Sequence, residues 1–134
     1  MPEELVGEFI LKCGDNAGRV WAILNEKGPL RQKEIQDKSR LNNIDFHTAV
    51  GWLARENKIS KDSEGVYKLD ATNLTSLIGT NAGRVWKTID IWGEIEFNSI
   101  KRLTDVTDEE VYSALGWLAR EHKVDTDNNR YILK

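Results

Sequence analysis

The chain has 134 residues, of which 40% are hydrophobic and 31% charged, a balance typical of a soluble globular protein. Its net charge of −3 is spread evenly over the two halves, which excludes the broad basic surface of most nucleic-acid-binding proteins and leaves room only for a local one. The single cysteine, Cys13, excludes an internal disulfide, and two histidines offer almost no ligands for a zinc site.

The apolar run near the N-terminus, residues 9–11, is far too short for a signal peptide or a membrane span. A lone cysteine also agrees with a reducing compartment. We therefore expect a cytoplasmic protein that has no membrane partner.

The most informative feature of the sequence is an internal duplication. The motif NAGRVW occurs at residues 16–21 and again at 81–86, and the motif GWLARE occurs at 51–56 and again at 116–121. Both pairs have the same separation, so the two motifs belong to one duplicated unit. The period is too long for a solenoid repeat and suits a small domain used twice.

The duplicated segment covers most of the chain. Residues 14–62 align without a gap with residues 79–127, and 18 of these 49 positions are identical. Each unit is near the lower size limit for a self-sufficient core, so we expect the two to share an interface. The expected boundaries are a lead-in at residues 1–13, a first domain at 14–70 and a second domain at 71–134 with a linker at 71–78.

Each copy begins with an amphipathic helix. Its apolar residues recur at the i, i+3, i+4, i+7 spacing of a buried stripe. In the first copy this stripe consists of Ala17, Val20, Trp21 and Leu24. Asp15 or Asn16, and Thr80 or Asn81 in the second copy, are expected to cap these helices, because short polar side chains accept the free N–H groups of a first turn.

The remaining elements of each copy follow in the order short strand, short helix, third helix and β-hairpin. In the second copy, residues 94–97 alternate between polar and apolar as a strand does, and Thr107 with Glu110 forms a capping box that begins the third helix. Turn residues at 62–65 and 127–129 predict the two hairpins. This order is that of a winged helix-turn-helix domain. The expected fold is therefore mainly α with small β-hairpins, arranged as two tandem winged helix-turn-helix domains.

The two repeated motifs, NAGRVW and GWLARE, are similar to the signature of a little-studied family of bacterial and archaeal winged helix-turn-helix domains. The resemblance covers roughly residues 16–69 and 81–134. Members of that family are mostly single short domains without an assigned activity, so the tandem arrangement departs from the family pattern. The resemblance implies the fold and does not imply a particular function.

The third helix of the first copy is the expected DNA-reading element. In a winged helix that reads DNA in the usual way, this helix lies in the major groove with its N-terminal residues facing base edges. At 100° per residue, its expected outward face consists of Ile44, His47, Thr48, Gly51 and Arg55.

Ten residues of the first unit are candidate DNA contacts, because their side chains are basic or can form hydrogen bonds to bases and phosphates. They are Arg31, Lys33, Lys38, Arg40, Asn42, Asn43, His47, Thr48, Arg55 and Lys61. The alternative for each is that it only solvates a helix or hairpin surface. The second unit is the poorer candidate, because its third helix begins with the carboxylates Asp108, Glu109 and Glu110, which would repel phosphates.

Four residues are candidate interface positions. Gly51 and Gly116 lie inside the third helices, where glycine lowers helix propensity. Either another backbone approaches them, as in a domain–domain or dimer contact, or packing within the unit needs the space. Ile91 and Trp92 replace the polar residues 26–27 of the first copy, and we expect this apolar pair to meet the other half of the chain or a second chain.

No catalytic set is evident, because the sequence has no phosphate-binding glycine loop, no HExxH motif and no setting that would activate its cysteine. We expect no cofactor, no small-molecule substrate and no enzymatic activity. Two functions stay open. The first is a DNA-binding, transcription-associated protein that contacts double-stranded DNA mainly through its first unit. The second is a protein–protein interaction module, with a homodimer or another protein as partner, that has kept the scaffold without nucleic-acid binding.

Overall fold

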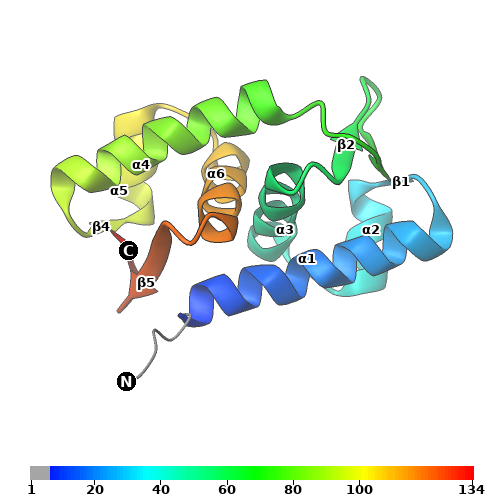
Figure 1. The fold of residues 1–134 in the computed structure, drawn as a ribbon, viewed down its shortest axis with the longest axis horizontal. Helices are drawn as coiled ribbons and strands as arrows, with labels where there is room; N and C mark the ends of the chain where they lie inside the picture. The colour runs from blue at the N-terminus through cyan, green and yellow to red at the C-terminus, as the bar shows by residue number, and fades with distance from the viewer. Residues whose placement is uncertain (1–6) are drawn as a thin grey trace.

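The computed structural model describes residues 7–134, so the first six residues of the expected lead-in lie outside it. The elements of the first unit are α1 (Glu8–Lys27), β1 (Leu30–Arg31), α2 (Gln32–Ser39), α3 (Asn43–Arg55), β2 (Ile59–Lys61) and β3 (Val66–Leu69) (Figure 1). A five-residue π-helix, η1 (Thr75–Gly79), leads into the second unit. The elements of the second unit are α4 (Thr80–Trp92), β4 (Ile95–Glu96), α5 (Phe97–Thr104), α6 (Asp108–Arg120), β5 (Val124–Asp127) and β6 (Arg130–Leu133).

Each unit has a three-stranded antiparallel sheet, in the order β1-β3-β2 in the first unit and β4-β6-β5 in the second. The registers correspond, since Leu30 pairs with Tyr67 and Ile95 pairs with Tyr131. In both units the hairpin that follows the third helix forms the wing. The prediction of two tandem winged helix-turn-helix units, mainly α with small hairpins, is confirmed.

The first helix of each unit begins earlier than the capping pattern indicated. α1 starts at Glu8, and both Asn16 and its counterpart Asn81 are buried inside helices without capping a first turn. The prediction that residues 15–16 and 80–81 cap the helices is therefore wrong. The physical reason is that the buried residues Ile10 and Cys13 continue the apolar stripe toward the N-terminus, so the helix extends past the polar residues.

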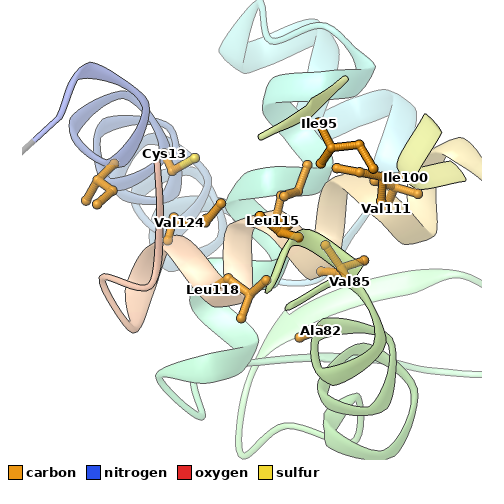
Figure 2. Packing of buried hydrophobic residues seen from close by; sticks show 13 residues of the cluster. Cys13, Ala82, Val85, Ile95, Ile100, Val111, Leu115, Leu118 and Val124 are labelled. Carbon is orange, nitrogen blue, oxygen red and sulfur yellow. The ribbon is translucent and has the colours of Figure 1, made fainter. Parts of the chain in front are cut away.

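The segments that precede the two repeats are exchanged between the units. Ile10 and Cys13 of α1 belong to the hydrophobic core of the second unit, and Figure 2 shows Cys13 in one cluster with Leu115 and Val124. In return, Ile78 of η1 is buried in the core of the first unit. Each core is thus completed by a segment that comes before the other repeat, which ties the two units together.

The centre of the molecule is the contact between α3 and α6, which lie side by side between α1 and α4 (Figure 1). Gly51 lies directly against the backbone of Ser113, and Gly116 lies against the backbone of Thr48. A Cβ atom on Gly51 would come within 2.9 Å of the Trp117 backbone nitrogen, a separation that real Cβ atoms do not adopt. Close approach of the two helix backbones therefore requires glycine at both positions.

Replacement of these glycines tests the contact. We expect Gly51→Ala and Gly116→Ala each to lower the free energy of unfolding by about 2 kcal/mol or more, because the new methyl group meets a helix backbone that cannot rotate away. The matched control is Gly18→Ala in α1, where nothing lies within 4 Å of the added Cβ. That change should raise the free energy of unfolding by about 0.5–1 kcal/mol through helix propensity. Urea unfolding followed by tryptophan fluorescence measures all three, and equal effects at the three positions would contradict the close contact.

Candidate functional site

The expected DNA-reading face of α3 lies inside the molecule. His47 is 8% exposed and Thr48 is 2% exposed, and Gly51 is buried against α6. The Thr48 hydroxyl donates a hydrogen bond to the backbone oxygen of Asp45 at 3.1 Å, so it is satisfied within its own helix. The prediction that these three residues face outward is wrong. These residues do face away from the core of their own unit, as the helical periodicity indicated. The prediction failed because α6 of the other unit covers that face.

The same holds for the third helix of the second unit. Ser113 and Gly116 are buried against α3, and the Tyr112 ring stacks on Phe97 with centroids 4.5 Å apart. Exposed residues remain at the first turn, where Asp108 forms a 2.7 Å ion pair with Lys101. This hydrogen bond to Asp108 raises the pKa of the Lys101 ammonium. The acidic start of α6 is thus partly neutralised from α5.

The two arginines of the GWLARE motifs join the units. Arg55 pairs with Glu121 at 3.0 Å, and Arg120 pairs with Glu56 at 2.9 Å. Each guanidinium also lies over the tryptophan ring of the opposite motif, Arg55 at 5.8 Å from the Trp117 centroid and Arg120 at 5.7 Å from that of Trp52. Arg55, expected as a DNA contact, is therefore engaged between the units.

A local basic cluster stays exposed on the first unit. It consists of Lys33, Lys38 and Arg40 on α2 and the turn after it, and none of the three forms an ion pair within residues 7–134. Asn42 and Asn43 lie next to it, but the Asn42 side chain caps α3 by accepting from the Asp45 backbone N–H at 2.8 Å. The cluster can reach phosphates from the outside of the unit.

Two further candidate contacts belong to the wing of the first unit. The Arg31 guanidinium donates to the backbone oxygen of Glu64, which fixes the hairpin turn against β1. Lys61 is exposed, and its ammonium lies 5.4 Å from the centroid of the Tyr67 ring. Arg31 is therefore committed to the fold, while Lys61 keeps a free charged end.

Ile91 and Trp92 do not contact the other half of the chain. They are 68% and 60% exposed at the end of α4, so the prediction that they could meet the first unit is wrong, and a second chain remains as the expected contact. Leu103 of α5, which is 45% exposed, lines the same surface hollow as Trp92, with a volume of about 200 Å³. We call Ile91, Trp92 and Leu103 the Trp92 patch. Sequence reasoning missed Leu103, although it replaces the first copy's Lys38 just as Ile91 and Trp92 replace charged residues.

His47 has an environment that the sequence did not indicate. Burial lowers the pKa of its imidazole, and this effect exceeds the opposing influence of Glu109. The ring meets Phe46 edge-on at 5.0 Å and lines a hollow formed with α6 and η1 of the other unit. At neutral pH His47 is therefore an uncharged donor and acceptor rather than a cation for phosphates.

The described part of the chain holds no group of three His, Cys, Asp or Glu side chains that could bind a metal ion. Likewise, none of its helices has the length and apolar character needed to cross a membrane. Cys13 is buried in the core of the second unit, and burial raises the pKa of its thiol from 9.0 to about 12. A thiol in this state is a packing group and not a nucleophile.

Comparison with known families decides the classification of these units. The model of a family described as a winged helix-turn-helix domain (DUF2582) matches the chain twice, over residues 10–68 and 71–133. The chain belongs to this family. The tandem resemblance inferred from the two repeated motifs is thus confirmed. No curated protein and no solved structure matches the chain. Membership in the family establishes the scaffold, and the surfaces described above must carry the function.

The state of Cys13 can be measured directly. At pH 8 we expect Ellman's reagent to react with the folded protein about two orders of magnitude or more slowly than with the chain in guanidinium, because the folded thiol stays protonated and covered. Above pH 9.0 the unfolded thiol ionises while the folded one holds its proton up to about pH 12. The stabilisation from this burial is therefore complete below pH 9 and is lost as the pH rises. Reaction of the folded protein at the rate of a free thiol would contradict the burial.

Proposed function

We propose that the chain is a protein–protein interaction module that keeps the winged helix-turn-helix scaffold and docks another protein on the Trp92 patch. The observation that carries the proposal is a difference between the two copies at three surface positions. Where the first unit has Glu26, Lys27 and Lys38, the second has the exposed residues Ile91, Trp92 and Leu103.

The surface that winged helices commonly use to read DNA supports the same conclusion. A recognition helix must be free to enter the major groove. In this chain α3 and α6 cover each other, and Trp52 and Trp117 at their contact pack against both hydrophobic cores. Freeing either helix would expose both cores, so major-groove reading by α3 or α6 is strongly disfavoured.

The chemistry of the Trp92 patch indicates its partner. Large apolar side chains on a rim of polar residues mark contact sites, and aromatic residues dominate the binding energy of such sites. The hollow between Trp92 and Leu103 has room for one apolar side chain. Arg102 lines it and forms no ion pair with any described residue. The partner is therefore a protein segment with an aromatic or aliphatic anchor next to an acidic residue.

DNA binding in transcription is the second candidate function, and the exposed cluster of Lys33, Lys38 and Arg40 favours it. Winged helix-turn-helix domains commonly bind DNA. Lys61 on the wing adds a fourth free cation on the first unit. Contacts of this kind would involve phosphates from the outside of the unit, without reading base edges through α3.

The docking proposal is tested with random peptides displayed on phage. We expect selection on the intact protein to enrich peptides that carry an aromatic or aliphatic anchor beside Asp or Glu. The triple variant Ile91→Glu, Trp92→Lys, Leu103→Lys carries the residues of the first copy, so the fold should tolerate it with a stability change of about 0.5 kcal/mol or less. Binding of the selected peptides should fall at least about tenfold in this variant, since the anchor loses its apolar contacts.

Two outcomes would contradict the docking proposal. One is selection without enrichment, or peptides that bind the triple variant as well as the original protein. The other is a molar mass in solution that corresponds to two chains and that the triple variant reduces to one, because the patch would then bind a second copy. The matched control is Trp86→Lys, which changes another partly exposed tryptophan of α4 outside the Trp92 patch and should leave peptide binding unchanged.

A salt titration with mixed-sequence duplex DNA tests the second candidate. At about 0.15 M salt we expect a dissociation constant weaker than about 10⁻⁴ M, the same for the original protein and for Lys33→Ala, Lys38→Ala, Arg40→Ala, Lys61→Ala combined. If contacts to about four phosphates form instead, affinity falls with a logarithmic salt slope of about −3 to −4, and the combined variant loses it. Lys87→Ala, an exposed cation outside the cluster, is the control. A steep slope that depends on the four residues would establish DNA binding as the function.

A further inference from the structure

A second surface of the molecule has the features of a small-ligand site, independently of the Trp92 patch. It is a hollow of about 140 Å³ where α3 and the wing of the first unit meet η1 and the start of α6. We call it the His47 pocket. Apolar side chains form most of its wall, among them Val50, Leu77 and Ile78. An apolar cavity of about 150 Å³ holds a body the size of a benzene ring.

The imidazole of His47 is the polar group inside the pocket. It is 8% exposed, yet it makes no hydrogen bond to any residue between 7 and 134. Its ring nitrogens are not fully enclosed, so solvent in the hollow reaches them in the absence of a ligand. The two ring nitrogens of a neutral imidazole offer one donor and one acceptor to a ligand.

Two opposite charges at the rim also lack partners. Lys61 and Glu109 line the pocket, and neither forms an ion pair with another residue in the described chain. Both act electrostatically on His47, in opposite directions, so both lie near its ring. Two neighbouring polar groups are already in use, since Glu110 accepts from the Thr107 backbone N–H and Ser113 donates to the Glu110 backbone oxygen.

The second unit does not repeat this arrangement. At the positions equivalent to His47, Lys61 and Glu109 the other copy has Tyr112, Thr126 and Ile44. A hollow lies there as well, lined by Ile44 and Tyr112, without the unpaired cation and anion. The divergence between the two copies has therefore left each chain with one pocket that has apolar walls and a charged rim.

We propose that the His47 pocket binds a small zwitterion with an apolar side chain, an amino acid of the size of leucine. Its ammonium group pairs with Glu109, its carboxylate pairs with Lys61, His47 donates or accepts one hydrogen bond, and the side chain packs against Leu77 and Ile78. Leu77 is 51% exposed in the absence of a ligand, and the bound side chain covers it. Each unpaired group of the pocket thereby obtains the partner that its chemistry requires.

Calorimetric titration of the intact protein with L-leucine tests the proposal, together with two analogues that each lack one charge, 3-methylbutylamine and 4-methylpentanoate. We expect saturable binding of one leucine per chain, and binding of both analogues at least about tenfold weaker, as expected for loss of a charge-assisted contact. No binding of leucine at millimolar concentration, or binding of either analogue as tight as that of leucine, overturns the proposal.

Variants locate the binding in the pocket. His47→Phe keeps the ring shape and removes the hydrogen bond, while Glu109→Gln and Lys61→Gln each remove one charge, and all three should weaken leucine binding at least about tenfold. The controls are Tyr112→Phe at the position equivalent to His47 and Lys68→Gln on the same wing, where Lys68 pairs with Asp70. Thermal unfolding of each variant shows that it is folded. Equal binding by the three pocket variants and the two controls places leucine elsewhere and overturns the proposal.

Discussion

The close approach of α3 and α6 is the constraint on which the rest of the structure depends. Gly51 and Gly116 let two helix backbones touch, and a side chain at either position would push the helices apart. Trp52 and Trp117 flank this contact and pack against both cores, so neither core is complete without it. The helix face that a winged helix usually presents to DNA has become a joint between two copies of the domain.

The identity of the GWLARE motif in both copies follows from this joint. A nearly two-fold contact uses each residue twice, once from each side, so the same residue is needed in both copies. The glycines provide the approach, the tryptophans fill the flanks, and the pairs Arg55–Glu121 and Arg120–Glu56 close the edges. Each pair is partly solvated and contributes at most about 1 kcal/mol, so glycine and tryptophan packing holds the joint and the ion pairs fix its register.

The sequence predicted the fold of each unit well and the relation between the units poorly. Periodicity identified the buried stripe of the first helix except at Trp21, which is 40% exposed, because the rest of that stripe faces the core of its own unit. It placed His47 and Thr48 outside, because no pattern within one unit records that another unit covers the opposite face. The exchange of Ile10 and Ile78 between the cores was missed for the same reason. The Trp92 patch was partly visible, since Ile91 and Trp92 depart from the first copy, whereas the His47 pocket depends on residues that meet only in three dimensions.

The segment that connects β3 to α4 joins the two units covalently, and this affects how many partners the molecule can bind. A two-fold assembly of separate, identical chains shows every surface feature twice and can cross-link its partners into larger assemblies. Here the two copies are covalently joined, so each can change its surface while the joint keeps its symmetry. Ile91 and Trp92 occur on one copy alone. The centre of the molecule is therefore symmetric, while its exterior carries the Trp92 patch only once. A partner bound through this patch would end the assembly, whereas a symmetric dimer with two such patches would extend it.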